Sequence, residues 1–192
     1  MAKEAEIGGT RRGIPWRILG WSVPVILLLL PLIAMQFTEE VDWTASDFVF
    51  ATVLFGSVGL AFEFIVRKST SVAYRCAASL AVIAAFLTIW ANGAVGMIGS
   101  EDNPYNIVFG GVLLVALIGS VMARLEPLGM ARAMAVAAAA QAVASGFGFT
   151  TDVRGAIFSM GFAGFWLLSA ALFWNAARDR ATTGAGELSK PS

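Results

Sequence analysis

Three polar side chains lie inside stretches that are otherwise apolar, namely Glu63, Asn92 and Gln141. A charged or amide group at membrane depth is costly to bury, so we treat these three as a candidate polar membrane site. Glu63 precedes Arg67 by four residues, the spacing of a helical ion pair, so it either sets the depth of its helix or couples a proton or cation. Asn92 and Gln141 either bond a neighbouring helix or contribute to a polar pathway.

Three glycines follow Asn92 at intervals of three residues: Gly93, Gly96 and Gly99. On a helix this spacing forms a groove into which a neighbouring backbone packs closely, and close packing is what drives helix association in lipid. The glycines are therefore predicted to be helix-packing residues. The alternative is a bent or unwound segment that lines a cavity, because glycine tolerates such backbone.

Oxygen-bearing side chains gather in the segments between the apolar runs, and hard cations prefer such ligands. The candidate acidic cluster on the predicted outer face consists of Asp42, Asp47, Glu101, Asp102 and Asn106. Their spacing matches no calcium-binding loop, and acidic loops commonly stay solvated. We therefore predict no metal site.

The composition excludes most enzyme classes. The chain has no His, which excludes imidazole metal sites, histidine-ligated haem and Ser-His or Cys-His catalysis. The single cysteine, Cys76, can form neither an intramolecular disulfide nor a CxxC redox pair. No phosphate-binding glycine loop, nucleotide fingerprint or basic nucleic-acid patch is present. We predict no catalytic residues, no cofactor and no nucleic-acid partner.

The candidate residues must be positioned by membrane helices. Of the 192 residues, 58% are hydrophobic and only 14% are charged. Six apolar runs of 17 to 23 residues are each long enough to cross about 30 Å of hydrocarbon as a helix. The runs are Ile18–Met35, Phe48–Val66, Cys76–Ile98, Ile107–Ala123, Ala133–Phe149 and Ala156–Trp174. The sequence predicts an all-α, polytopic transmembrane helix bundle with six spans.

The charges orient this bundle. Twelve of the thirteen Lys and Arg residues fall on one side of the threaded chain, and only Arg154 falls on the other. The positive-inside rule then places both termini in the cytoplasm. The fifth run is mostly Ala, but omitting it as a span would leave three basic residues outside. The predicted organisation is a polar N-terminus (1–15), a transmembrane domain (16–176) and a flexible cytoplasmic tail (177–192).

A cleaved signal peptide is the competing interpretation of the first run, since a basic flank precedes a Leu-rich stretch. The run contains Pro24 and Pro31, however, and ends in Leu32-Ile33-Ala34, a poor cleavage site. We therefore expect an uncleaved first helix.

Several short motifs resemble a family of small multi-span bacterial inner-membrane proteins without assigned activity. They are Trp43 with Asp47-Phe48, Glu63 before Arg67-Lys68, Asn92-Gly93-Ala94-Val95-Gly96 with Glu101-Asp102-Asn103-Pro104, and Gly129-Met130-Ala131-Arg132-Ala133. The resemblance spans roughly residues 30–140. It implies placement in the bacterial cytoplasmic membrane and provides no catalytic residues.

We expect an accessory or assembly component that docks on another membrane protein or on a second copy of itself, within the lipid bilayer. The alternative is a transporter or channel for small solutes or ions, formed by one chain or an oligomer. A lipid- or quinone-linked enzyme is the third class. A cavity that reaches Asn92 or Glu63 would favour transport, whereas a filled bundle with an exposed small-residue face would favour docking. A headgroup-depth pocket containing Glu101, Asp102 or Asp152 would favour an enzyme.

Overall fold

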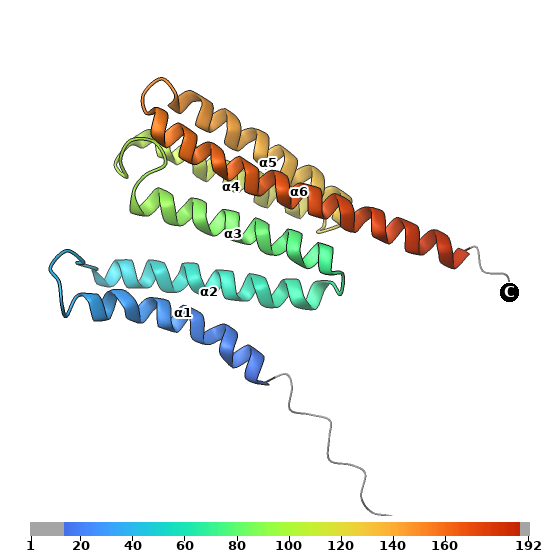
Figure 1. Cartoon of the computed structure of the whole chain (residues 1–192), viewed down its shortest axis with the longest axis horizontal. Helices are drawn as coiled ribbons and strands as arrows, with labels where there is room; N and C mark the ends of the chain where they lie inside the picture. Colours follow the sequence, from blue (N-terminus) through green and yellow to red (C-terminus); the bar gives the residue numbers. More distant parts are fainter. Residues whose placement is uncertain (1–13, 189–192) are drawn as a thin grey trace, which may run out of the picture. The chain divides into compact units, whose positions relative to one another are not determined.

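The computed structural model describes the backbone of residues 14–188 and the side chains of residues 20–183. Within these residues it consists of α-helices and one short 3-10 turn, without strands (Figure 1). The elements are α1 (Ile14–Ala34), α2 (Ala45–Lys68), α3 (Val72–Ala94), η1 (Pro104–Asn106), α4 (Ile107–Met122), α5 (Pro127–Gly148) and α6 (Val153–Leu188).

Five segments of the described chain are long and apolar enough to cross a membrane: α2, α3, η1 with α4, α5, and α6 as far as Thr183. The chain is therefore a multi-pass membrane protein built from helices. The apolar part of α1 within the side-chain-described range, Gly20–Ala34, is shorter than a full span. A sixth span at α1 remains a prediction.

Two boundaries differ from those predicted. Helix α3 ends at Ala94, four residues before the end of the apolar run, because the glycines that follow leave the helical conformation. Helix α6 continues past residue 176 to Leu188, so the segment predicted as a flexible tail is helical up to that point. Residues 177–182 include the helix formers Ala and Arg. Because this segment is polar, hydropathy alone does not identify it as a helix.

The chain divides into two compact units, residues 1–61 and 62–192, and the boundary falls within α2. In the first unit, Gly59 of α2 faces the Trp21 ring of α1, so that a Cβ atom on Gly59 would lie 3.2 Å from that ring. Pro24 and Pro31 lie within α1, where each removes a backbone donor from the helix.

The second unit contains the helical bundle α3–α6. Consecutive helices run antiparallel, with α5 packed on both α4 and α6, and α6 packed on α3 (Figure 1). Small residues permit these close approaches: a Cβ atom on Gly119 of α4 would lie 2.8 Å from the Cβ atom of Ala133 in α5. The Ser169 hydroxyl of α6 donates to the carbonyl oxygen of Ala77 in α3 at 2.8 Å, which ties these two helices inside the core.

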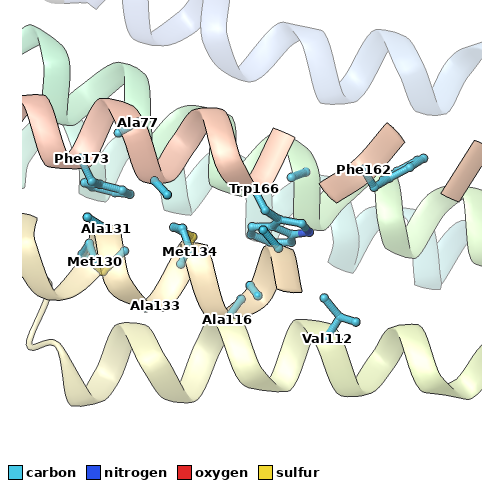
Figure 2. Packing of buried hydrophobic residues seen from close by; sticks show 14 of the residues in the cluster. Ala77, Val112, Ala116, Met130, Ala131, Ala133, Met134, Phe162, Trp166 and Phe173 are labelled. Carbon is cyan, nitrogen blue, oxygen red and sulfur yellow. The ribbon is translucent and has the colours of Figure 1, made fainter. Parts of the chain in front are cut away.

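The interior of the bundle is filled with large side chains. Figure 2 shows Trp166 and Phe173 of α6 pointing toward α5, where Met130 and Met134 lie. Trp166 and Phe173 are 1% and 0% exposed, respectively, so both are packing residues of the core. The Ala-rich composition of α5 follows from its position, because it is the most buried of the five candidate spans and packs between two neighbours. The weakest apolar run is thus central to the bundle.

Candidate functional site

The connection between α3 and α4, residues Val95–Asn103, folds back against the bundle. Met97 and Ile98 are each 1% exposed, which is unusual for a surface loop. Gly96 and Gly99 have φ angles of 76° and 73°, a left-handed conformation that glycine adopts without steric cost. The predicted glycine groove along one helix is therefore wrong, since only Gly93 is helical. The segment is unwound, as in the alternative, but it packs against the bundle through Met97 and Ile98.

Asn106 fixes this connection from the start of α4. Its Oδ1 atom accepts from the backbone N–H of Ile98 at 2.9 Å, and its Nδ2 atom donates to the carbonyl oxygen of Ser100 at 2.8 Å. The side chain is buried, with 3% of the residue exposed. Its assignment to an exposed outer cluster of cation ligands is wrong, because both ends of the amide already satisfy backbone groups.

Asp152 fixes the same connection from the start of α6. One carboxylate oxygen accepts from the N–H of Gly99 at 2.8 Å, and the other accepts from the N–H of Gly155 at 3.0 Å. These backbone donors, first Gly155 and then Gly99, hold the pKa of Asp152 below its ordinary value of 3.8. Asp152 thus caps α6 and anchors a loop distant in sequence. The sequence signal for the cap was an Asp directly before an apolar helix.

Asn92 and Gln141 bond different elements. Asn92 Nδ2 donates to the carbonyl oxygen of Asn106 at 3.3 Å, and Gln141 Nε2 donates to that of Ser159 in α6 at 3.0 Å. Gln141 thus bonds a neighbouring helix, and Asn92 bonds the 3-10 turn that precedes α4. Their Oδ1 and Oε1 atoms, together with Ser145 Oγ, are unpartnered and completely covered by protein.

Glu63 forms the helical ion pair that its spacing predicts, with Oε1 at 2.5 Å from the guanidinium of Arg67. The Arg67 side chain is 69% exposed and that of Glu63 is 24% exposed, so the pair lies at the surface of its helix.

Among the residues whose side chains are described, no group of three or more Asp, Glu or Cys side chains could hold a metal ion. Asp47 instead caps α2, because its carboxylate accepts from the N–H of Thr44 at 2.7 Å and from the Thr44 hydroxyl at 2.8 Å. Asp42, Glu101 and Asp102 are exposed.

A polar cleft that the sequence did not predict lies at the opposite end of the bundle, beside the turn between α4 and α5. Its volume is about 420 Å³, and hydroxyl groups are the most frequent feature of its lining. The lining residues are Ser69, Thr70, Ser71, Tyr74, Pro127, Ala176, Asp179, Arg180 and Thr183. They come from three segments far apart in sequence, and nothing in their individual contexts indicates that they meet.

Two contacts shape this cleft. The Tyr74 hydroxyl donates to the carbonyl oxygen of Leu125 at 2.9 Å and so supports the turn before α5. Arg180 forms an ion pair with Glu126 at 2.5 Å, with side-chain exposures of 62% and 60%.

The sequence matches no protein-family model, and neither a curated protein nor a solved structure shows significant similarity to it. The function must therefore be inferred from the geometry of the chain's own residues.

Proposed function

We propose that this protein is an accessory or assembly component that docks on another membrane protein through the outward face of α5. The observation behind this proposal is a stripe of small residues that the bundle leaves uncovered. Ala135, Ala139 and Gly146 are exposed, and Ala142 between them is half-buried. Their spacings of four, three and four residues keep them on one side of the helix.

A lipid-facing helix has no physical need for small side chains. Large exposed residues are the ordinary case, as for Leu114, Leu117 and Ile118 of α4, which are 55–60% exposed. Such residues also lie beside the stripe on α5, where Val136, Val143 and Phe147 are 57–67% exposed. A stripe of Ala and Gly instead allows another helix backbone to approach closely, which is the main source of helix affinity in lipid. On α5 a Cβ atom at Gly146 would meet nothing within 4 Å, so no other part of the chain occupies the space beside this glycine.

The filled interior of α3–α6 supports docking over transport. Phe109, Phe173 and Met97 are each at most 1% exposed, and the amide oxygens of Asn92 and Gln141 are covered. A path for ions or small solutes needs accessible polar groups, whereas these oxygens are covered by protein.

For the surroundings, we propose the bacterial cytoplasmic membrane with six spans and both termini inside. The distribution of the basic residues supports this orientation, and the short motifs described above support the bacterial origin.

The test is to enlarge one residue of the stripe and measure retention of the partner. Ala139→Leu is expected to abolish co-purification of a different membrane protein in mild detergent, measured by native mass spectrometry. Ala171→Leu, at an exposed alanine of α6, is the matched control and should retain the partner. The proposal would be contradicted if the unmodified protein, expressed at its native abundance and extracted from its native membrane, purified without any partner protein.

A further inference from the structure

The polar cleft beside the α4–α5 turn lies at the depth where lipid headgroups begin. Ser69, Thr70 and Ser71 directly precede the candidate span that starts at Val72, and Pro127 begins another. Asp179, Arg180 and Thr183 occupy the last turns of the span that ends at Thr183. The cleft is thus at a membrane boundary whichever way the chain is oriented.

One part of the cleft offers hydrogen-bond donors. Ser71 Oγ accepts from the N–H of Tyr74 at 3.3 Å, and Ser69 Oγ accepts from the N–H of Ser71 at 3.2 Å, so both hydroxyls keep a proton to donate. Arg180 adds a guanidinium. Its ion pair with Glu126 is exposed on both sides, and such pairs contribute little, so Arg180 can also serve a ligand.

The other charged group in the cleft is a carboxylate. Asp179 is adjacent to Arg180 in sequence and lines the same space. A simple anion would be attracted by Arg180 and repelled by Asp179. A zwitterion that has a phosphate and an ammonium group satisfies both.

The apolar part of the lining belongs to the spans themselves. Pro127 is buried at the start of α5 and Ala176 is 4% exposed in α6, so the cleft adjoins the membrane-embedded part of the bundle. A soluble ligand would make no contact with that embedded part, whereas a lipid bound in the cleft has acyl chains that continue into the bilayer.

The geometry points to a binding site for the headgroup of a phospholipid that contains both a phosphodiester and a primary ammonium group. Arg180 and the hydroxyls of Ser69 and Ser71 bind the phosphate, and Asp179 binds the ammonium. This site is independent of the docking face on α5, and either can fail without the other.

Native mass spectrometry of the full-length protein in detergent tests this site with three probes: phosphatidylethanolamine, phosphatidylglycerol with the same acyl chains, and soluble phosphoethanolamine. The unmodified protein is expected to retain the ethanolamine lipid over the glycerol lipid by about fivefold, the size of one exposed charge contact. Asp179→Asn should remove this preference, and Arg180→Gln should weaken retention of both lipids by about fivefold.

Arg178→Gln is the matched control, because Arg178 is exposed on the same helix and does not line the cleft. It should behave as the unmodified protein does. Equal retention of both lipids by the unmodified protein and all variants would overturn the proposal. Such a result would mean that the retained lipid surrounds the helices non-specifically. Binding of phosphoethanolamine as tight as that of the lipid would also overturn it, in favour of a soluble ligand. Thermal unfolding of each variant confirms that it is folded.

Discussion

At the residue scale, the polar side chains near the α3–α4 connection mainly satisfy backbone that is not helical. Asn106 and Asp152 accept from the N–H groups of Ile98 and Gly99, which a helix would have bonded internally. The sequence predicted which polar residues lie among apolar ones, and Glu63 pairs with Arg67 as its spacing indicates. It could not predict the bond between Gly99 and Asp152, because 53 residues separate them and no local pattern connects them.

The role of Asp152 leads to a pH prediction. Its folded-state pKa is lower than its ordinary value of 3.8, so the stability that it contributes is present above that pH and is lost as the pH falls through the folded-state pKa. Asp152→Asn should therefore lower the unfolding temperature in detergent at neutral pH. Below pH 3.8 the difference from the unmodified protein should shrink, as measured by thermal scans across the pH range. A difference that is constant with pH would show that the charge of Asp152 does not matter.

At the element scale, the sequence identified the helices better than their ends. Glycines at every third position are compatible with a helix groove and with an unwound chain, so Gly96 and Gly99 alone could not separate the two. The deciding feature is tertiary, because burial of Met97 and Ile98 against the bundle holds the connection in its folded-back conformation. The polar cleft was missed for a similar reason, since α3, α5 and α6 each contribute only part of it.

Gly96 tests this conformation most directly. A Cβ atom there would clash with the carbonyl group of Ser100, and the left-handed backbone disfavours any other residue by about 1–2 kcal/mol. Gly96→Ala is expected to lower the free energy of unfolding by at least about that amount, measured by denaturant or thermal unfolding in detergent. Gly93→Ala is the control, since Gly93 is helical and a Cβ atom there meets nothing within 4 Å. Equal effects of the two substitutions would contradict the assignment.

At the scale of the whole molecule, composition and run length are sufficient to predict a multi-pass helical membrane protein. The arrangement of α3–α6 was not predictable, because each helix has apolar residues on several sides and packing in lipid depends on the fit of small residues. The orientation of the chain in the membrane is predicted from the positions of its Lys and Arg residues, which can be read directly from the sequence. It therefore remains a prediction with a clear test.

Replacing Cys76 with Ser removes the only thiol and allows single cysteines to report topology. A membrane-impermeant maleimide applied to intact cells should label Glu39→Cys and Thr150→Cys, which lie in predicted outer segments. It should not label Thr70→Cys or Thr183→Cys until the membrane is opened. Labelling of Thr70→Cys in intact cells would contradict the predicted orientation, and protection of both Glu39→Cys and Thr70→Cys would show that α2, which separates them, does not span.

The docking role of α5 is tested most directly by photo-crosslinking in the native membrane from a benzophenone side chain placed at Ala139. The proposal predicts one discrete crosslinked product with a different membrane protein, and no such product from the same probe at Leu117, an exposed position of α4. Crosslinks from Ala139 to lipid alone, as at Leu117, would contradict the proposal that this face docks on a partner.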